Sequence, residues 1–169
     1  MDELMHQMSL EAITLESLIE AMGRKGVVPP MLAMPYFSGP VFDVDLLARD
    51  GQPLYVIARR RFHPRTTPFR GCVLDRNPAV IALATQILEA LRLHYLHDVD
   101  IMLDAEGQPH LLEVNPRLSG SVIASITAGV NLLDYLVRLA LGREVPQIEI
   151  PYGKSIKPSI RTVCLNGAA

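Results

Sequence analysis

The sequence predicts an α+β fold, in which an antiparallel sheet is covered by helices on one face. Two pairs of short aliphatic segments are each joined by a turn that contains Asp-Gly or Glu-Gly, which is typical of β-hairpins. Helical segments do not follow each strand in turn, so the βαβ alternation of a parallel sheet is missing. The chain has 169 residues, 49% hydrophobic and 20% charged, which is enough for one buried core.

The N-terminal residues 1–30 are predicted to be a helical lead-in and a linker, and residues 31–169 to be one subdomain. Ser9 and Gly23 are suitable caps for a helix over residues 9–22. Residues 31–37 are predicted to form a strand. A β-hairpin is then expected over 41–48 and 54–62, with its turn at residues 50–52.

The second half of the chain carries clearer boundary signals. Residues 63–76 are expected to be a polar loop, after which Asn77 and Pro78 start a helix that runs to about Leu91. A second hairpin is predicted over 98–104 and 109–115. Residues 121–141 should be helical in two pieces, broken near Gly129, with Asn131 capping the second piece. The tail, 147–165, should add one or two short strands.

Composition excludes several classes of partner. The formal net charge is −2 and no Lys/Arg cluster has interleaved aromatic residues, so no nucleic acid is expected to bind. No apolar run is long enough to span a bilayer and the N-terminus lacks a signal-peptide pattern, which predicts a cytoplasmic protein without a membrane partner. Only 5% of residues are aromatic, so the aliphatic excess fits either an uncovered interface or a Leu/Ile/Val-rich core.

The second predicted hairpin has one acidic face. If Asp104 lies opposite Pro109, four polar side chains share one face of the hairpin, and they are Asp98, Asp100, Glu113 and Asn115. Opposed carboxylates repel unless water or a cation separates them, and hard oxygen ligands suit Mg²⁺ or Mn²⁺. A solvated acidic face is the alternative, and a slip of one residue in one strand would disperse the group.

Arg117 follows this strand directly, after Pro116, and could bind a phosphoryl or carboxylate oxygen in bidentate fashion. Ser119-Gly120-Ser121 then leads into a helix, where backbone N–H groups can face an anion. The alternatives are an ordinary exposed arginine and an ordinary helix cap.

These residues resemble the ATP-grasp superfamily, in its carbamoyl-phosphate-synthase-like branch. The resemblance is most specific at residues 113–117 and 119–121, and segments 98–102, 128–132 and 139–142 are also similar to that branch. Residues 34–45 are similar to the segment that lines the nucleotide pocket. Together the resemblance covers roughly residues 31–142.

The resemblance implies a carboxylate–amine ligase-like enzyme, in which ATP activates a small carboxylate as an acyl phosphate for attack by an amine. The implied cofactors are ATP and Mg²⁺ or Mn²⁺, and the implied metal ligands are Asp100, Glu113 and Asn115. Arg117 would stabilise the acyl phosphate and is the implied catalytic residue. The implied ATP-binding residues are Tyr36, Phe37, Asp45, Arg59, Arg61, Ser119 and Ser121. For Arg59 and Arg61, a solvent-facing basic strand edge is the alternative.

The sequence also departs from the family pattern. The separate N-terminal domain and the lysine-bearing lid over the phosphates are not recognisable, so the chain resembles only the C-terminal subdomain and is expected to be incomplete on its own. The alternatives are a fragment, a split-gene subunit and a degenerate relative, and a partner chain or a homodimer would supply the lid. Pro35 and Val41 stand where relatives often have glutamates, and Asp100 stands where Gln or Glu is common. The alternative function is therefore a non-catalytic, degenerate ATP-grasp module for nucleotide sensing or subunit assembly.

Overall fold

The computed structural model describes residues 13–25, 30–31, 33–63 and 70–159, in two units, 1–37 and 38–169. The first unit contains helix α2, Leu15–Lys25. Ser9 lies outside the described residues, and the prediction that Gly23 ends the helix is wrong. A glycine in a helix costs only about 1 kcal/mol, and the Arg24–Glu20 ion pair spans this turn. The predicted strand at 31–37 is also wrong, since its described residues have no strand partner.

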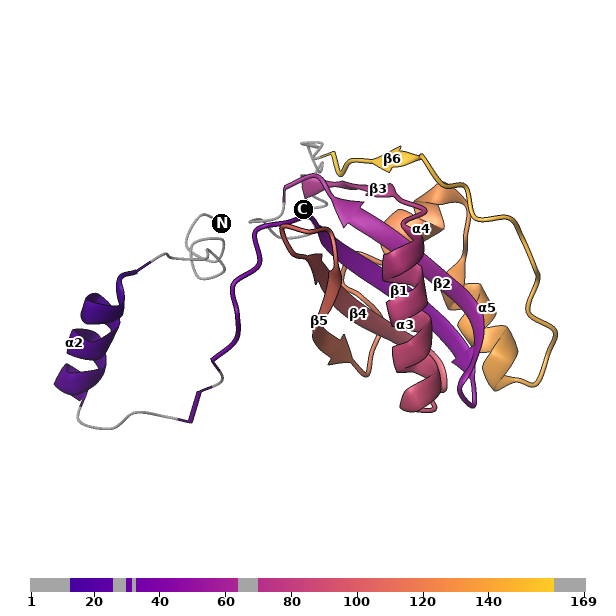
Figure 1. Ribbon diagram of the computed structural model, residues 1–169. Helices are drawn as coiled ribbons and strands as arrows, with labels where there is room; N and C mark the ends of the chain where they lie inside the picture. The colour runs from indigo at the N-terminus through magenta and orange to yellow at the C-terminus, as the bar shows by residue number, and fades with distance from the viewer. Residues whose placement is uncertain (1–12, 26–29, 32, 64–69, 160–169) are drawn as a thin grey trace, which may run out of the picture. The chain divides into compact units, whose positions relative to one another are not determined.

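The second unit is built on one antiparallel sheet of six strands, in the order β5-β4-β1-β2-β3-β6 (Figure 1). The strands are β1 (Val41–Arg49), β2 (Gln52–Arg61), β3 (Cys72–Leu74), β4 (Tyr95–Leu103), β5 (Pro109–Asn115) and β6 (Ser155–Ile156). Both predicted hairpins and a short tail strand are confirmed. Between β1 and β2 the two turn residues, Asp50 and Gly51, have φ of 50° and 83°, as a type I′ turn requires.

Strand β3 lies inside the segment predicted to be a loop. It pairs with β2 through Arg59↔Leu74 and with β6 through Cys72↔Ile156. Three residues carry too little alternation to be recognised in the sequence, and the strand exists because both of its edges find partners.

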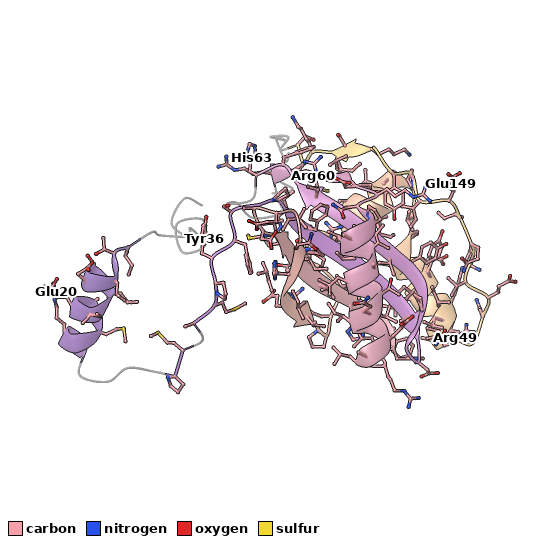
Figure 2. The ribbon with its side chains drawn as sticks, viewed as in Figure 1. Glu20, Tyr36, Arg49, Arg60, His63 and Glu149 are labelled. Carbon is pink, nitrogen blue, oxygen red and sulfur yellow. The ribbon has the colours of Figure 1, made fainter. Side chains whose placement is uncertain are left out.

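Helices cover both faces of the sheet, so the prediction of one covered face is wrong. Helix α3, Pro78–Ala90, crosses one face, while α4, Ile123–Ala128, and α5, Leu132–Ala140, lie behind the sheet on the other (Figure 1). Eight of the nine residues of β1 are buried, as a strand covered on both sides requires. Side chains fill the space between α3 and the sheet (Figure 2).

The helix boundaries follow the predicted signals. The Asn77 side chain accepts hydrogen bonds from the first turn of α3 at 3.1 Å, and the Asn131 side chain accepts one from Asp134. Gly129, with φ of 115°, separates α4 from α5. None of the described helices is long and apolar enough to cross a bilayer.

Two hydrophobic cores result, one on each side of the sheet. The first includes Val44, Leu46, Ala58, Leu88 and Val99 beneath α3, and the second includes Leu47, Ile57, Val130, Leu132 and Leu139 beneath α4 and α5. Because successive residues of a strand face opposite sides, Asp43 and Asp45 lie on the same face as Leu47. The polar residues of the central strands therefore lie on the face that α4 and α5 partly cover.

Candidate metal and phosphate site

Two rows of polar side chains cross the central strands. In the first row Asp43 of β1 lies opposite Asp100 of β4, which lies opposite Glu113 of β5. In the second row Asp45 lies opposite Asp98, which lies opposite Asn115. Directly opposed side chains are close enough to interact, so the sheet gathers five carboxylates from three strands on one face.

The predicted pairing of the second hairpin is confirmed at the site and wrong at the turn. Asp98 pairs with Asn115 and Asp100 with Glu113, but Leu103, not Asp104, pairs with Pro109. A register shift between Asp100 and Ile101 compensates for the difference. The bulge is a local kink that one extra residue introduces, and without it the polar and apolar faces of β5 would be exchanged.

Arg59 forms the buried end of the site. Its guanidinium donates to both carboxylate oxygens of Asp45 at 2.9 Å and to Ser121 Oγ at 2.7 Å. Ser125 of α4 donates a further hydrogen bond to Asp45 at 2.5 Å, and Ser119 Oγ lies 2.9 Å from Ser121 Oγ. Burial lowers the pKa of Arg59, but Asp45 and Asp43 outweigh it, so the pKa is raised overall. The arginine is 0% exposed, which rules out the solvent-facing alternative for it.

Arg61 lies at the more open end. Its guanidinium donates to the Asp43 carboxylate and, at 3.0 Å, to Asp100 Oδ2. Its side chain is 15% exposed, so it also does not form a solvent-facing edge. Arg61 thus bridges the two carboxylates that oppose each other across β1 and β4, and it offsets their repulsion.

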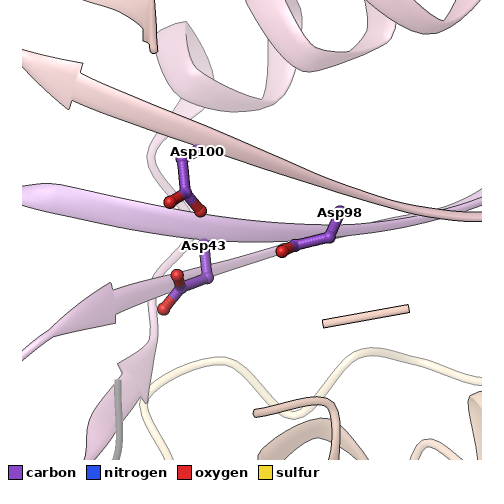
Figure 3. A group of neighbouring side chains, drawn as sticks. All are labelled: Asp43, Asp98 and Asp100. Atoms are coloured by element: carbon purple, nitrogen blue, oxygen red, sulfur yellow. The ribbon is translucent and has the colours of Figure 1, made fainter. Parts of the chain in front are cut away.

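Three carboxylates are neighbours on this face, those of Asp43, Asp98 and Asp100 (Figure 3). One oxygen from each lies within 4.8 Å of the others. The buried Oδ1 atoms of Asp98 and Asp100 have no hydrogen-bond partner among the described residues. Burial, followed by the charge of Asp100, raises the pKa of Asp98 to about 7. Burial also raises the pKa of Asp100, although Arg61 opposes the shift.

Glu113, Asn115 and Arg117 form the exposed edge of the site. Asn115 Nδ2 donates to Glu113 Oε1 at 2.8 Å, and Asn115 Oδ1 accepts from Arg117 Nη2 at 3.2 Å. Arg117 Nη1 lies 3.7 Å from Asp98 Oδ2. The Arg117 side chain is 59% exposed, so its guanidinium can reach an added anion.

The donor set fits a hard divalent cation. Buried carboxylate oxygens without partners are costly unless a cation or water satisfies them, and Asp98 and Asp100 each supply one. Among the described residues, the five carboxylates of the two rows face three guanidinium groups, those of Arg59, Arg61 and Arg117, so negative charge is in excess there. Carboxylate oxygens are ligands that suit Mg²⁺.

The structure brings most of the predicted site residues together. Asp45, Arg59, Ser119 and Ser121 form its buried network, and Asp100, Arg61, Glu113, Asn115 and Arg117 form its open part. Tyr36 and Phe37 belong to the first unit, and their assignment to the nucleotide remains a prediction.

Asp43 and Ser125 are not among the residues that the sequence predicts for the site. Asp98 is predicted to lie on the acidic face that suits Mg²⁺ or Mn²⁺, but it is not among the implied metal ligands. For Asp43 the available signal was its alternation with Asp45 in an otherwise apolar strand, since polar residues at every second position of a buried strand share one face. Ser125 carried no such signal, because it comes from a helix that meets β1 only in the folded chain.

The antiparallel sheet, with its acidic and basic side chains gathered in rows on one face, belongs to an ATP-grasp domain. The family described as ATP-grasp in the biosynthetic pathway with Ter operon matches residues 27–160, and the chain belongs to this family. No curated protein matches the chain.

Solved structures share the fold. An L-amino acid ligase from Bacillus licheniformis is 19% identical, with a TM-score of 0.57, over 77% of this chain and 36% of that one. A D-alanine–D-alanine ligase from Bacillus anthracis, complexed with ATP, is 20% identical, with a TM-score of 0.51, over 76% and 47%. An N5-carboxyaminoimidazole synthetase from Staphylococcus aureus is 13% identical, with a TM-score of 0.52, over 66% and 32%. The chain thus spans a third to a half of these proteins.

Proposed function

We propose that this chain binds Mg·ATP and supplies the metal and phosphate half of a ligase that activates a carboxylate for attack by an amine. The observation that carries the proposal is a pair of buried oxygens, Asp98 Oδ1 and Asp100 Oδ1, beside the cations of Arg61 and Arg117. Neither oxygen has a hydrogen-bond partner in the described part of the chain. Membership of the ATP-grasp family supports a nucleotide as the ligand.

Each charged residue would have a distinct role. Asp98 and Asp100 would hold Mg²⁺ from β4, with Asp43 and Glu113 on either side. The ion would neutralise charge on the phosphates during transfer. A cation bound there competes with Arg61 for Asp100, which frees one side of that guanidinium for a phosphate oxygen.

Arg117 is the most exposed cation of the site and is the proposed catalytic residue. Its guanidinium can bind the transferred phosphoryl group in bidentate fashion and stabilise charge that develops on it. Asn115 accepts a hydrogen bond from Arg117 and orients it. Arg59, in contrast, would act through Asp45 and Ser121 as a structural support, because its guanidinium is fully engaged.

The proposed reaction has two steps. A carboxylate oxygen of the substrate attacks the γ-phosphorus of ATP, a new O–P bond forms, and the bond to the β,γ-bridging oxygen breaks as ADP leaves. The amine then attacks the acyl carbon, inorganic phosphate leaves with the C–O electron pair, and the amine proton passes to solvent. Two proteins that share the fold are an L-amino acid ligase and a D-alanine–D-alanine ligase, which supports this reaction type. The parts of a ligase that this chain does not span, or a second copy, would cover the nucleotide.

Calorimetric titration of Mg·ATP tests the proposal. Glu113→Ala should weaken binding by about tenfold while the protein stays folded, because Glu113 is exposed at the edge of the site. Glu106→Ala is the matched control, since Glu106 is an exposed carboxylate in the β4–β5 turn. Absence of Mg·ATP binding in the unmodified chain, or equal binding by both variants, would contradict the proposal.

A second candidate is a non-catalytic module that binds nucleotide for sensing or assembly. The complete burial of Arg59 favours this candidate. The family resemblance implies that Arg59 binds ATP, but a fully buried guanidinium cannot contact the phosphates. Trapping with hydroxylamine separates the two candidates. A ligase converts its activated carboxylate to a hydroxamate in the presence of Mg·ATP, whereas a sensing module binds Mg·ATP and yields none.

A further inference from the structure

A cavity lies next to the carboxylate site. It has a volume of about 240 Å³ and lies between β3, α4 and the segment that contains β6. Its lining includes Ser121, whose Oγ accepts a hydrogen bond from Arg59 Nη1. The same nitrogen lies 3.9 Å from Asp43 Oδ2. One guanidinium therefore separates this cavity from the carboxylates that would hold the metal.

The lining has one charge and a largely aliphatic wall. Its apolar side chains are Ile123, Ala124, Ile156 and Pro158. Neither an aromatic residue nor a carboxylate is among the described lining residues, and Lys157 is the only cation there. Burial raises the pKa of the Cys72 thiol, so it lines the cavity as a neutral group.

Lys157 is free to receive an anion. Among the described parts of the chain it forms no ion pair, and its Nζ lies 5.5 Å from the centroid of the Phe62 ring. A single cation beside an aliphatic wall is complementary to a ligand with one negative charge and an apolar body. The absence of an aromatic lining residue removes the surface on which a planar base would stack.

The volume limits the size of the ligand. About 240 Å³ is the space of roughly eight water molecules at about 30 Å³ each. That is below the usual range for sites of drug-sized ligands. The cavity therefore has space for a small metabolite but not for a whole nucleotide.

We propose that this cavity holds the aliphatic body of the carboxylate substrate, and that Lys157 balances the charge of the acid. The inference rests on the proposed ligase function and names its substrate class: a small aliphatic monocarboxylate. Thr127 and Ile123, on the exposed side of α4, border the cavity and would set the length of chain that it accepts.

Methyl NMR of the isoleucine side chains tests the proposal, with isovalerate as the probe. Saturable shifts of the Ile123 and Ile156 methyl signals are expected. Lys157→Gln should weaken binding by about tenfold, because a charge-assisted hydrogen bond is lost. Arg143→Gln, which removes the same charge from an exposed residue after α5, should leave binding unchanged. Two control ligands are tested on the unmodified chain: isovaleramide, which lacks the charge, and phenylacetate, which has a planar ring. Each should bind no more tightly than isovalerate binds to the Lys157→Gln variant.

Thr127→Phe provides a second variant that does not depend on charge. Thr127 is exposed on α4, so the larger side chain should fill the cavity from its rim and abolish the shifts without unfolding the protein. Saturable shifts that survive Thr127→Phe, equal binding of isovalerate and isovaleramide, or no shift at Ile123 and Ile156 would each overturn the proposal.

Mg·ATP titration on the same sample separates the two proposals. Mg·ATP binding without isovalerate shifts overturns the assignment of the cavity and leaves the ligase function standing. Isovalerate shifts without Mg·ATP binding overturn the ligase function, and with it the role of the ligand as a substrate.

Discussion

Arg59 and Asp45 form a bidentate ion pair inside the protein, with two hydrogen bonds of 2.9 Å between neighbouring strands. Both side chains are almost completely buried, and Ser121 and Ser125 satisfy their remaining polar atoms. A buried pair of this kind contributes little net stability compared with apolar packing, but loss of one partner leaves an uncompensated buried charge.

Arg59→Met should therefore lower the free energy of unfolding by about 3 to 5 kcal/mol, as measured by urea denaturation. Arg60→Met is the matched control, because Arg60 is the next residue of β2, its side chain is 41% exposed, and it pairs with Asp75 at the surface (Figure 2). This variant should lose about 1 kcal/mol or less. Equal losses of unfolding free energy in the two variants would contradict the prediction that the buried Arg59–Asp45 pair is more sensitive to substitution than a surface pair.

Asp98 should make the stability of the protein depend on pH. Its pKa is about 7 in the folded chain against an ordinary value of 3.8, so the folded state keeps the proton longer. The stabilising contribution is complete below about pH 4 and is lost as the pH rises through about 7.

Asp98→Asn should remove the loss of stability that occurs as the pH rises, because asparagine does not ionise. Between pH 5 and 8, in the absence of divalent cations, the variant should gain about 2 to 3 kcal/mol of unfolding free energy relative to the unmodified chain. Urea denaturation at the two pH values measures the difference. Glu106→Gln, in the exposed β4–β5 turn, is the control, and its unfolding free energy should change with pH as that of the unmodified chain does. If the unfolding free energy of Asp98→Asn also changed in that way, the predicted ionisation of Asp98 would be contradicted.

Gly39 is predicted to be intolerant of any side chain. A Cβ at this position would lie 2.3 Å from the carbonyl oxygen of Leu103, at the point where Pro40 O accepts a hydrogen bond from Leu103 N. Gly39→Ala should destabilise the second unit by about 2 kcal/mol or more, because backbone must move. Gly120→Ala, which meets no atom within 4 Å, is the control and should be near neutral in thermal denaturation.

Tyr55 ties the segment after α5 to the sheet. Its hydroxyl donates to Pro146 O and accepts from Ile148 N at 3.1 Å, while its ring stacks on Tyr135 with centroids 5.3 Å apart. Tyr55→Phe keeps the ring and removes both hydrogen bonds. We expect a loss of about 1 to 2 kcal/mol and faster hydrogen exchange at the Ile148 amide.

Tyr152→Phe is the matched control for this prediction. Among the described residues, the Tyr152 hydroxyl makes one long hydrogen bond, to Val56 O at 3.4 Å. The control should lose less stability and should not change exchange at Ile148. Unchanged exchange in Tyr55→Phe would mean that the segment is held by other contacts.

Local patterns were sufficient for the hairpins, the capped helices and the composition of the acidic face. The Asp50-Gly51 turn, the Asn77 and Asn131 caps and the alternation of Asp98 with Asp100 are decided by residues near one another in the sequence. Such features depend on turn conformation, capping and side-chain period, which a sequence displays directly. The family signature at residues 113–117 was likewise legible in the chain itself.

Only the tertiary structure decided what those features face. The order of the sheet places β1 between β4 and β2, so Asp43 meets Asp100 on one side and Arg61 on the other. The same order buries Arg59 against Asp45, although both were expected at an open phosphate site. Pairings between strands that are distant in the chain, the second covered face and the cavity beside Lys157 depend on how separate elements pack. Packing is set by the burial of all of them together and not by any local pattern.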